Sequence, residues 1–324
     1  MATNGPTAPT LLDLHPQSDD LRDAIHQGMR RLQKRLPTLL LYDERGSQLF
    51  DAITEVPEYY PTRTELSIMD ASMEQIAKAI GPQASLIELG SGSSMKTRLL
   101  LQQLPELAAY VPVDISRDHL MAAATELARD YPAVEVLPVC ADFNEPFRLP
   151  TPRISPQRNI VYFPGSTIGN LDFGGAHKLL STMRRIAKKG GAVLIGVDLV
   201  KPREILEPAY DDAQGVTADF NLNILTRLNR EFGANFNLEH FHHRAVWDGS
   251  RSRIEMRLVS EIAQEVEIDG ERFSLAANEH ILTEYSHKYS LEVFANLART
   301  AGFEVECVWT DPQQWFSVQY LVVN

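Results

Sequence analysis

The chain has 324 residues, of which 44% are hydrophobic and 23% are charged, so it can bury a large core as one domain or two closely packed ones. Its formal net charge of -12, without a Lys/Arg-rich run, argues against nucleic acid and anionic membranes as partners. Cys140 and Cys307 lie far apart without a CxxC pair, which predicts buried, reduced thiols rather than a disulfide framework or a thiolate zinc site.

The first 80 residues are expected to be mostly helical after a disordered start. Residues 1–17 combine prolines and small residues without apolar periodicity, which predicts a disordered tail. From Ser18, an N-cap, an acidic first turn and helically spaced apolar residues predict a helix that ends at Pro37, and similar features predict a second helix over 64–80. We therefore expect an N-terminal helical segment over 18–80, with a tyrosine-rich connection between its two helices.

The next region alternates short apolar runs with helical segments. The runs are ASLIEL, AYVPVD, VEVLPVCAD, NIVYFPG and AVLIGVDLV. Nearly unbroken apolar runs between helices are typical of parallel strands that are covered on both faces of a sheet. The pattern predicts a Rossmann-like, doubly wound, mostly parallel α/β domain over 81–200.

Past Tyr210 the sequence changes to a long helical pattern followed by amphipathic strands. The strand candidates HFHHRAVWD, SRIEMRLVSEI and QEVEIDGERFSLA carry Asp-Gly turns at Asp248-Gly249 and Asp269-Gly270. These features predict a second, smaller α+β lobe over 201–288. The pattern over residues 289–324 predicts a helix, a strand, a turn and a second strand, and this segment is expected to return to the first sheet.

The first predicted strand hands over to a helix through LIELGSGSSMKTR, where Gly90 and Gly92 permit a sharp bend and a close ligand approach. The third position of a dinucleotide GxGxxG fingerprint is Met95, and a Walker A loop would be longer, so pyrophosphate is poorly supported. An acidic residue followed by such a turn is the pattern by which many methyltransferases receive S-adenosylmethionine. Lys96 could face a phosphate, although a solvated lysine or one that faces a substrate carboxylate fits the pattern better.

Acidic residues stand at the ends of the next two strands. Asp114 can accept hydrogen bonds from both ribose hydroxyls of a nucleoside, or it can, like Ser116, cap the following helix. Asp142 can take the amino group of an adenine that Phe143 covers, or the two can be a turn acid and a core aromatic residue. Three strand-end features in chain order favour a ligand at this edge of the sheet.

The fourth strand is followed by the polar loop GSTIGN, which should face the same edge because open α/β sheets bind ligands beyond the carboxyl ends of their strands. Asn170 in this loop can donate to a carboxylate or can simply form a turn.

Several stretches together resemble one known family. They are TEVPEYYPTRTE, LIELGSGSSMKTR, VDIS, ADF, FPGSTIGNL, AYDDAQGVTADFNLNIL, RIEM and LTEYSHKY. The chain resembles, from about residue 20 to its C-terminus, the histidine-specific S-adenosylmethionine-dependent methyltransferases of ergothioneine biosynthesis. The resemblance implies a class I methyltransferase fold and trimethylation of the α-amine of L-histidine to hercynine, with S-adenosylmethionine leaving as S-adenosylhomocysteine and with no metal.

The resemblance also implies roles for individual residues. The positions that match the cofactor site are Tyr59, Gly90, Lys96, Asp114, Asp142 and Phe143. The positions that match the histidine site are Tyr42, Phe50, Gly165, Asn170, Tyr210, Met256, Glu284 and Ser286. Asn170 and Tyr210 would hold the substrate carboxylate, and Tyr42, Glu284 and Ser286 would engage the imidazole; Tyr42, Asn170 and Tyr210 are the expected catalytic positions.

The residue types suit methyl transfer, which is an in-line displacement that depends on positioning and desolvation. Tyrosine faces stabilise a quaternary ammonium, although tyrosines can equally be core residues. An acceptor at Glu284 would discriminate against an apolar side chain, so relatives that act on tryptophan derivatives should lack it. From the residues alone, Glu284 could be a surface strand residue and Met256 a core residue.

The sequence leaves other functions open. A methyltransferase of the same architecture could act on another amino acid or small amine, such as a tryptophan derivative. A nicotinamide-dependent oxidoreductase fits less well because the third glycine is missing, and a non-catalytic binding domain would bind its ligand without turnover. We expect a monomer, and the sequence shows neither a signal-peptide pattern nor eighteen consecutive apolar residues, which predicts a cytoplasmic protein.

Two further motifs could be mistaken for metal sites. In HFHHR, His242 and His243 should point to opposite faces of a strand, and no carboxylate cluster accompanies them. Asp211 and Asp212 precede a helical pattern, where carboxylates usually cap the helix and interact with its dipole.

Overall fold

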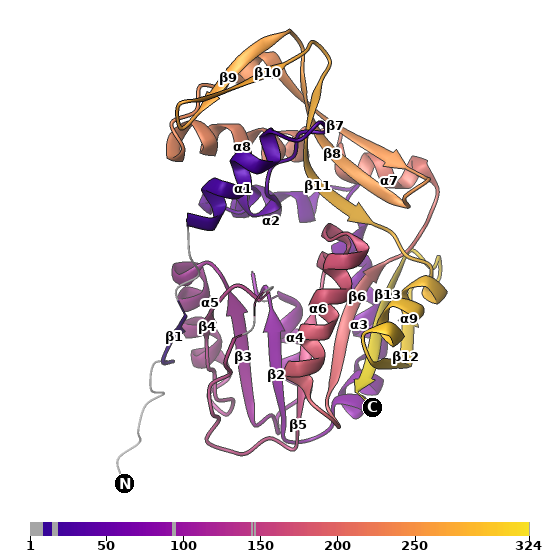
Figure 1. Ribbon diagram of the computed structural model, residues 1–324. Coiled ribbons are helices and arrows are strands. Elements are labelled where there is room, and N and C mark those ends of the chain that lie inside the picture. Colours follow the sequence, from indigo (N-terminus) through magenta and orange to yellow (C-terminus); the bar gives the residue numbers. More distant parts are fainter. Residues whose placement is uncertain (1–8, 15–18, 93–94, 144, 146, 324) are drawn as a thin grey trace.

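The computed structural model of the chain describes residues 9–14, 19–92, 95–143, 145 and 147–323. Figure 1 shows a large sheet with helices on it, and a second group of helices and strands that lies across the carboxyl ends of its central strands. This second group is called the lobe below. It contains α1, α2, α7, α8 and the strands β7 to β11, whose bounds are given with its description.

The large sheet has eight strands in the order β1-β4-β3-β2-β5-β6-β13-β12. The strands are β1 Leu12–Asp13, β4 Val139–Cys140, β3 Ala109–Asp114, β2 Ala84–Leu89, β5 Arg158–Phe163, β6 Ala192–Asp198, β13 Phe316–Val323 and β12 Phe303–Thr310. All neighbours pair in parallel except β13, which runs antiparallel to β6 and to β12. The chain moves outward from β2 to one side and then returns to β5 on the other, which creates a switch point between β2 and β5.

Helices cover both faces of this sheet, as its apolar strands require. One buried core joins the sheet to α3 Tyr60–Ile80, α4 Met95–Gln103 and α5 Arg117–Asp130. A second core on the opposite face joins it to α6 Phe173–Ala187 and α9 Leu291–Thr300. Every residue of β2 and of β6 is buried. The predicted doubly wound, mostly parallel α/β fold is confirmed, including the return of the C-terminal segment to the first sheet.

The lobe is built on a three-stranded antiparallel sheet and a hairpin. The sheet has the order β11-β8-β7, and β9 pairs with β10. The bounds are β7 Phe241–Asp248, β8 Arg253–Ser260, β9 Gln264–Ile268, β10 Glu271–Leu275, β11 His280–His287, α7 Arg203–Tyr210 and α8 Val216–Glu231, with a short 3-10 helix η3 Leu238–His240. The turn Asp269-Gly270 joins β9 to β10, as the sequence predicts.

The N-terminal segment completes the lobe rather than standing beside it. It forms α1 Asp19–Met29, a 3-10 helix η1 Thr38–Leu41 and α2 Glu44–Glu55 before α3. Apolar side chains of α1, η1 and α2 share one buried core with α7, α8 and the lobe strands. The lobe therefore draws on two distant parts of the sequence, and the division of the chain at residues 81, 201 and 289 stays a prediction.

Three expectations about the N-terminal segment need correction. The tail predicted over 1–17 is wrong for Leu12–Asp13, which pairs in parallel with β4, whereas residues 1–8 and 15–17 lie outside the described residues. The first helix ends at Met29, well before Pro37, and its predicted cap Ser18 is also outside the described residues. The tyrosine-rich connection contains α2, whose start is capped by Asp43, which accepts a hydrogen bond from the Gly46 N–H at 2.8 Å.

Candidate active site

The carboxyl ends of the central strands bring the predicted cofactor residues to one edge of the sheet. Gly90 directly follows β2, and Asp114 is the last residue of β3. Asp142 stands two residues beyond the end of β4. The Gly90 N–H donates to the Val113 carbonyl at 2.8 Å. The structure therefore places these three predicted residues side by side at the edge where open α/β sheets bind their ligands.

The glycine turn lies against an aromatic ring. Gly90 has a φ of +73°, which only glycine adopts without strain, and a Cβ built on it would lie 3.7 Å from the ring of Phe143. Phe143 in turn meets Phe163, the last residue of β5, edge to face at 5.8 Å. Phe143 thus covers the turn from one side, which agrees with a role in holding a flat ring at this edge.

Asp114 combines a local contact with a position at the sheet edge. Its carboxylate accepts the Ser116 N–H at 2.9 Å, which is a turn contact, and Ser116, the N-cap residue of α5, makes no side-chain cap. Burial raises the pKa of Asp114, and the N–H groups of Ser116 and Gly92 partly offset this effect. One carboxylate oxygen serves the turn, and the group stands next to the glycine turn of β2.

Lys96 is held by an acidic residue that the sequence interpretation missed. Its ammonium forms an ion pair with the buried carboxylate of Glu65 on α3. The same carboxylate accepts the Gly165 N–H at 2.9 Å, and a Cβ on Gly165 would lie 3.6 Å from the Lys96 Nζ. Glu65 therefore connects a predicted cofactor residue with a predicted substrate residue. A signal for it was the acid that closes the stretch PEYYPTRTE.

Space for Glu65 comes from a glycine in β6. A Cβ built on Gly196 would lie 2.3 Å from the Glu65 Oε1, so no larger residue fits there without a shift of the carboxylate. Gly196 therefore lets the Glu65 carboxylate lie directly against the central sheet.

Aromatic side chains form a continuous group beside this edge. Tyr42 contacts Phe50 with ring centroids 5.9 Å apart, Phe50 contacts Tyr59 at 6.3 Å, and Tyr59 contacts Tyr210 at 6.0 Å. Phe220 on α8, which was not predicted, packs against both Tyr42 and Phe50. Tyr59 and Tyr210 are buried, whereas Tyr42 is 36% exposed. The structure thus brings the predicted aromatic residues of both sites together.

Glu284 joins the lobe to the sheet edge. The Asn170 side-chain amide donates to its Oε1 at 2.9 Å, and Asn170 ends the short helix η2 Thr167–Asn170 that follows β5. Glu284 is buried on β11, so the interpretation as a surface residue is wrong. Burial raises the pKa of Glu284 to about 8, although Lys288 and Arg35 partly offset it.

The contact between η2 and β11 depends on close backbone packing. A Cβ on Gly169 would lie only 2.7 Å from the His287 carbonyl oxygen, so glycine is required where the two segments meet. Met256 pairs directly with Glu284 across β8 and β11 and lies in the lobe core. Its position agrees with the core interpretation and also places it next to the buried acid.

A cluster of six buried residues connects β6 with the lobe and is called the lysine cluster below. It comprises Tyr60, Asp198, Lys201, Tyr210, Ser286 and Lys288. Lys288 donates to Asp198 at 2.6 Å, to the Tyr210 hydroxyl at 2.7 Å and to the Ser286 hydroxyl at 2.7 Å. The Tyr210 and Ser286 oxygens lie 2.8 Å apart.

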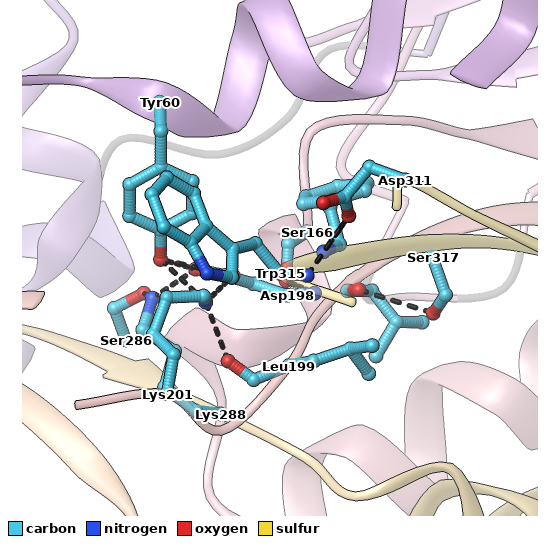
Figure 2. Close-up of polar contacts among 12 residues, drawn as sticks. Tyr60, Ser166, Asp198, Leu199, Lys201, Ser286, Lys288, Asp311, Trp315 and Ser317 are labelled. Atoms are coloured by element: carbon cyan, nitrogen blue, oxygen red, sulfur yellow. Dashed lines mark hydrogen bonds and ion pairs between the residues drawn. The ribbon is translucent and has the colours of Figure 1, made fainter. Parts of the chain in front are cut away.

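The other half of the lysine cluster lies toward α3. Lys201 donates to Asp198 at 2.5 Å and to the Tyr60 hydroxyl at 2.7 Å, and Tyr60 also donates to Asp198. Figure 2 shows both lysine side chains converging on Asp198. Burial opposes ionisation of Asp198, but Lys288 and Lys201 outweigh it and lower the pKa of this acid. Sequence interpretation found Tyr210 and Ser286 but missed the charged residues that hold them.

The two motifs that could suggest a metal make other contacts within the lobe. His242 is exposed and His243 is buried, which confirms that they point to opposite faces of β7. Asp212 accepts N–H groups at the start of α8, from Thr217 at 2.8 Å and from Val216 at 3.1 Å, as predicted for a cap. Within the described ranges, no group of three or more His, Cys, Asp or Glu side chains is arranged to hold a metal ion.

The fold and the sheet edge define a Rossmann-like α/β protein with an added lobe, whose ligand edge lies at the carboxyl ends of the central strands. A family model for histidine-specific, S-adenosylmethionine-dependent methyltransferases matches residues 21–323, so the chain belongs to that family. The family resemblance inferred from the sequence is confirmed.

Curated relatives extend this result. The chain is 41% identical over 311 residues to a histidine N-alpha-methyltransferase of Mycolicibacterium smegmatis, with 94% of this chain and 95% of the relative covered. It is 40% identical over 296 residues to that of Mycobacterium tuberculosis, with 90% and 91% covered. It is also 32% identical over 286 residues to ergothioneine biosynthesis protein 1 of Neurospora crassa, with 86% of this chain and 32% of the relative covered. No helix within the described part of the chain combines the length and apolar character needed to span a bilayer.

Proposed function

We propose that the protein transfers three methyl groups from S-adenosylmethionine to the α-amine of L-histidine, giving hercynine for ergothioneine biosynthesis and releasing S-adenosylhomocysteine. The observation that carries this proposal is the buried carboxyl of Glu284, which Asn170 holds at the junction between the lobe and the sheet edge. A buried acid without a polar ligand would be costly, and an imidazole supplies the hydrogen-bond partner that an apolar side chain lacks.

In this proposal the sheet edge binds the methyl donor. The glycine turn at Gly90 and the ammonium of Lys96 receive its amino-acid end, and Asp114 accepts the ribose hydroxyls. Asp142 takes the adenine amino group, and Phe143 covers the ring. Tyr59 completes the cofactor site, and its ring contacts with Phe50 and Tyr210, two proposed substrate residues, support a position beside the histidine site.

The lobe side holds the amino acid. Asn170 and Tyr210 bind the substrate carboxylate, and the main chain at Gly165 borders it. Tyr42, Glu284 and Ser286 engage the imidazole, with Phe50 and Met256 packed beside the ring. This assignment agrees with the direct contact of Glu284 with Asn170 and of Tyr210 with Ser286, because adjacent protein groups would then bind adjacent parts of one small substrate.

The chemistry that the site must perform is positioning rather than covalent catalysis. The sulfonium of S-adenosylmethionine supplies an activated methyl group, and the substrate amine attacks it in line. The site binds the substrate through its carboxylate and its imidazole, and these two contacts orient the amine. In favourable systems such orientation lowers the barrier by about 7 kcal/mol or more. The tyrosine faces favour the growing positive charge by roughly 0.5 to 2 kcal/mol each. Such a displacement requires no metal, and we propose that none takes part.

Incubation with L-histidine and methyl-labelled S-adenosylmethionine tests the proposal, with mono-, di- and trimethylated histidine followed by mass spectrometry. We expect label to reach the trimethylated product. A panel of other amino acids and amines, tryptophan derivatives included, runs in parallel. Label that reaches another amine and not histidine would overturn the assignment, and binding without any transfer would indicate a non-catalytic domain. Cytoplasmic location and a monomeric state stay predictions, which cell fractionation and light scattering would test.

A further inference from the structure

The buried ammonium of Lys288 leaves little freedom to the two hydroxyl groups beside it. Its three hydrogens point to the Asp198 carboxylate, the Tyr210 hydroxyl and the Ser286 hydroxyl, at 2.6, 2.7 and 2.7 Å. An ammonium is only a donor, so the oxygen atoms of Tyr210 and Ser286 must both accept from it. Burial lowers the pKa of Lys288, and the contact with the Asp198 carboxylate opposes this effect and favours the charged ammonium.

The hydroxyl groups of Tyr210 and Ser286 also contact each other. The Tyr210 and Ser286 oxygens are 2.8 Å apart, so one hydroxyl donates to the other. Among the described residues, these hydroxyls make no other hydrogen bond that the structure assigns. One hydroxyl hydrogen then remains on the pair, together with one unused lone pair on the other oxygen. The pair can offer a ligand one donor and one acceptor, on different oxygens, but never two donors.

The nearby charges decide whether Tyr210 or Ser286 keeps the free hydroxyl hydrogen. Asp198 carries one negative charge and lies between the two ammonium groups of Lys201 and Lys288. These three buried side chains together therefore carry one excess positive charge. An anionic ligand atom is therefore favoured next to the pair. If that anion lies at Tyr210, the tyrosine hydrogen points to it, Ser286 donates to Tyr210, and the lone pair of Ser286 stays available for an N–H donor.

We propose that Lys288 is a positioning residue that makes Tyr210 a donor to the substrate carboxylate and Ser286 an acceptor for an imidazole N–H. This inference rests on the proposed function, because it assumes that histidine is the substrate. It goes beyond that function by assigning the direction of each hydrogen bond, and it adds a residue that does not itself touch the substrate.

Binding of L-histidine and of histamine, which lacks the carboxylate, separates this role from a structural one. Affinities are measured by calorimetry with S-adenosylhomocysteine present, for the wild type and for Lys288→Met. We expect the variant to bind histidine at least tenfold more weakly and histamine by a clearly smaller factor, because both ligands use the Ser286 acceptor but only histidine uses the Tyr210 donor and the positive charge. Equal losses for the two ligands, or no loss, would overturn the proposal.

Lys201→Met is the matched control, since it removes a buried cation from the same carboxylate without touching Tyr210 or Ser286. Its ratio of histidine to histamine affinity should change much less than that of Lys288→Met. An equal change would show that charge alone, and not the orientation of the hydroxyl pair, is responsible.

Two further variants keep the proposal testable if Lys288→Met does not fold. Ser286→Ala should weaken histidine and histamine by the same factor, because both carry the imidazole. Tyr210→Phe should weaken histidine alone. The reverse pattern would contradict the assigned directions. If the wild type does not methylate histidine, the proposed function is wrong. If the wild type is active but the variants keep its ratio of histidine to histamine affinity, only this inference is wrong.

Discussion

The sheet edge and the lobe meet at the candidate site, but different parts of the sequence hold their residues in place. On the sheet edge, Gly90, Asp114 and Phe143 take their positions from the ends of individual strands or from the turns that follow them. On the lobe side, Glu284 reaches Asn170 across 114 positions of the sequence, and Lys288 reaches Asp198 across 90. Local turns should survive changes in the lobe, whereas the long-range contacts depend on how the lobe docks. Binding of the methyl donor and binding of the amino acid should therefore be separable by mutation.

The largest separation is expected for Glu284→Ala. Loss of a hydrogen bond to a buried ionisable group costs about 2 to 3 kcal/mol, so histidine affinity should fall roughly 100-fold. Affinity for S-adenosylhomocysteine should stay within about twofold, because the sheet edge is not altered. Calorimetry with each ligand measures both effects. Glu279→Ala is the control, since this partly exposed acid pairs with Lys34 directly before the same strand begins. Equal losses for the two ligands would contradict the separation.

The pH dependence of stability sharpens the comparison, because Glu284 is a lobe-side acid whose pKa is raised to about 8 by burial, against an ordinary value of 4.5. Between these values the folded protein holds a proton that the unfolded chain has released, so the contribution of Glu284 to stability falls as pH rises from about 4.5 to about 8 and then levels off. Relative to Glu284→Gln, the wild type should lose roughly 4 kcal/mol across this range, or about 1.4 kcal/mol per pH unit.

Denaturant unfolding of both proteins at several pH values measures this difference. Effects of Lys288, Arg35 and other titrating groups that both proteins share largely cancel in the comparison. A difference that stays constant from pH 5 to pH 8.5, or that changes with the opposite sign, would show that Glu284 is not held in its protonated form by burial.

The same contrast explains which parts of the molecule could be predicted from the sequence. The parallel sheet, the glycine turn and the Asp269-Gly270 hairpin were predictable because apolar periodicity and turn chemistry are local. Helix α7 was missed, and it contains Pro208, which argues against a helix when only the sequence is considered. The two-residue strand Leu12–Asp13 is too short to leave a periodic pattern.

In the candidate site, too, local features were predictable from the sequence and long-range contacts were not. Residues with a family counterpart, such as Asn170 and Glu284, could be named in advance, but their direct contact could not. Glu65, Lys201 and Lys288 were missed because the residues around a charged side chain give no local indication of a buried partner far away in the sequence. Such partners become visible only once the lobe is docked on the sheet.

On the sheet edge, Asp114→Ala should show the reverse of Glu284→Ala, with a smaller effect. Removal of the proposed acceptor of the ribose hydroxyls should weaken S-adenosylhomocysteine about tenfold, or about 1.4 kcal/mol. Histidine affinity measured at saturating S-adenosylhomocysteine should change less than twofold. Asp118→Ala serves as the control, because this acid is fully solvent-exposed in the first turn of α5. A loss confined to histidine would place Asp114 in the wrong site.

The smallest effect is expected for His242→Ala, which tests whether the histidine-rich strand β7 belongs to either side of the site. His242 is half-exposed and pairs with the equally exposed Glu261, so its removal should change stability by no more than about 0.5 kcal/mol. His243 points the other way, and its ring nitrogens contact the Tyr210 carbonyl at 2.8 Å and the Asn221 amide at 2.9 Å, so His243→Ala should destabilise the lobe much more. Thermal unfolding with and without added zinc measures both variants. If zinc stabilises the wild type but not His242→Ala, this strand carries a metal site, and the interpretation of His242 as a solvent-facing residue is wrong.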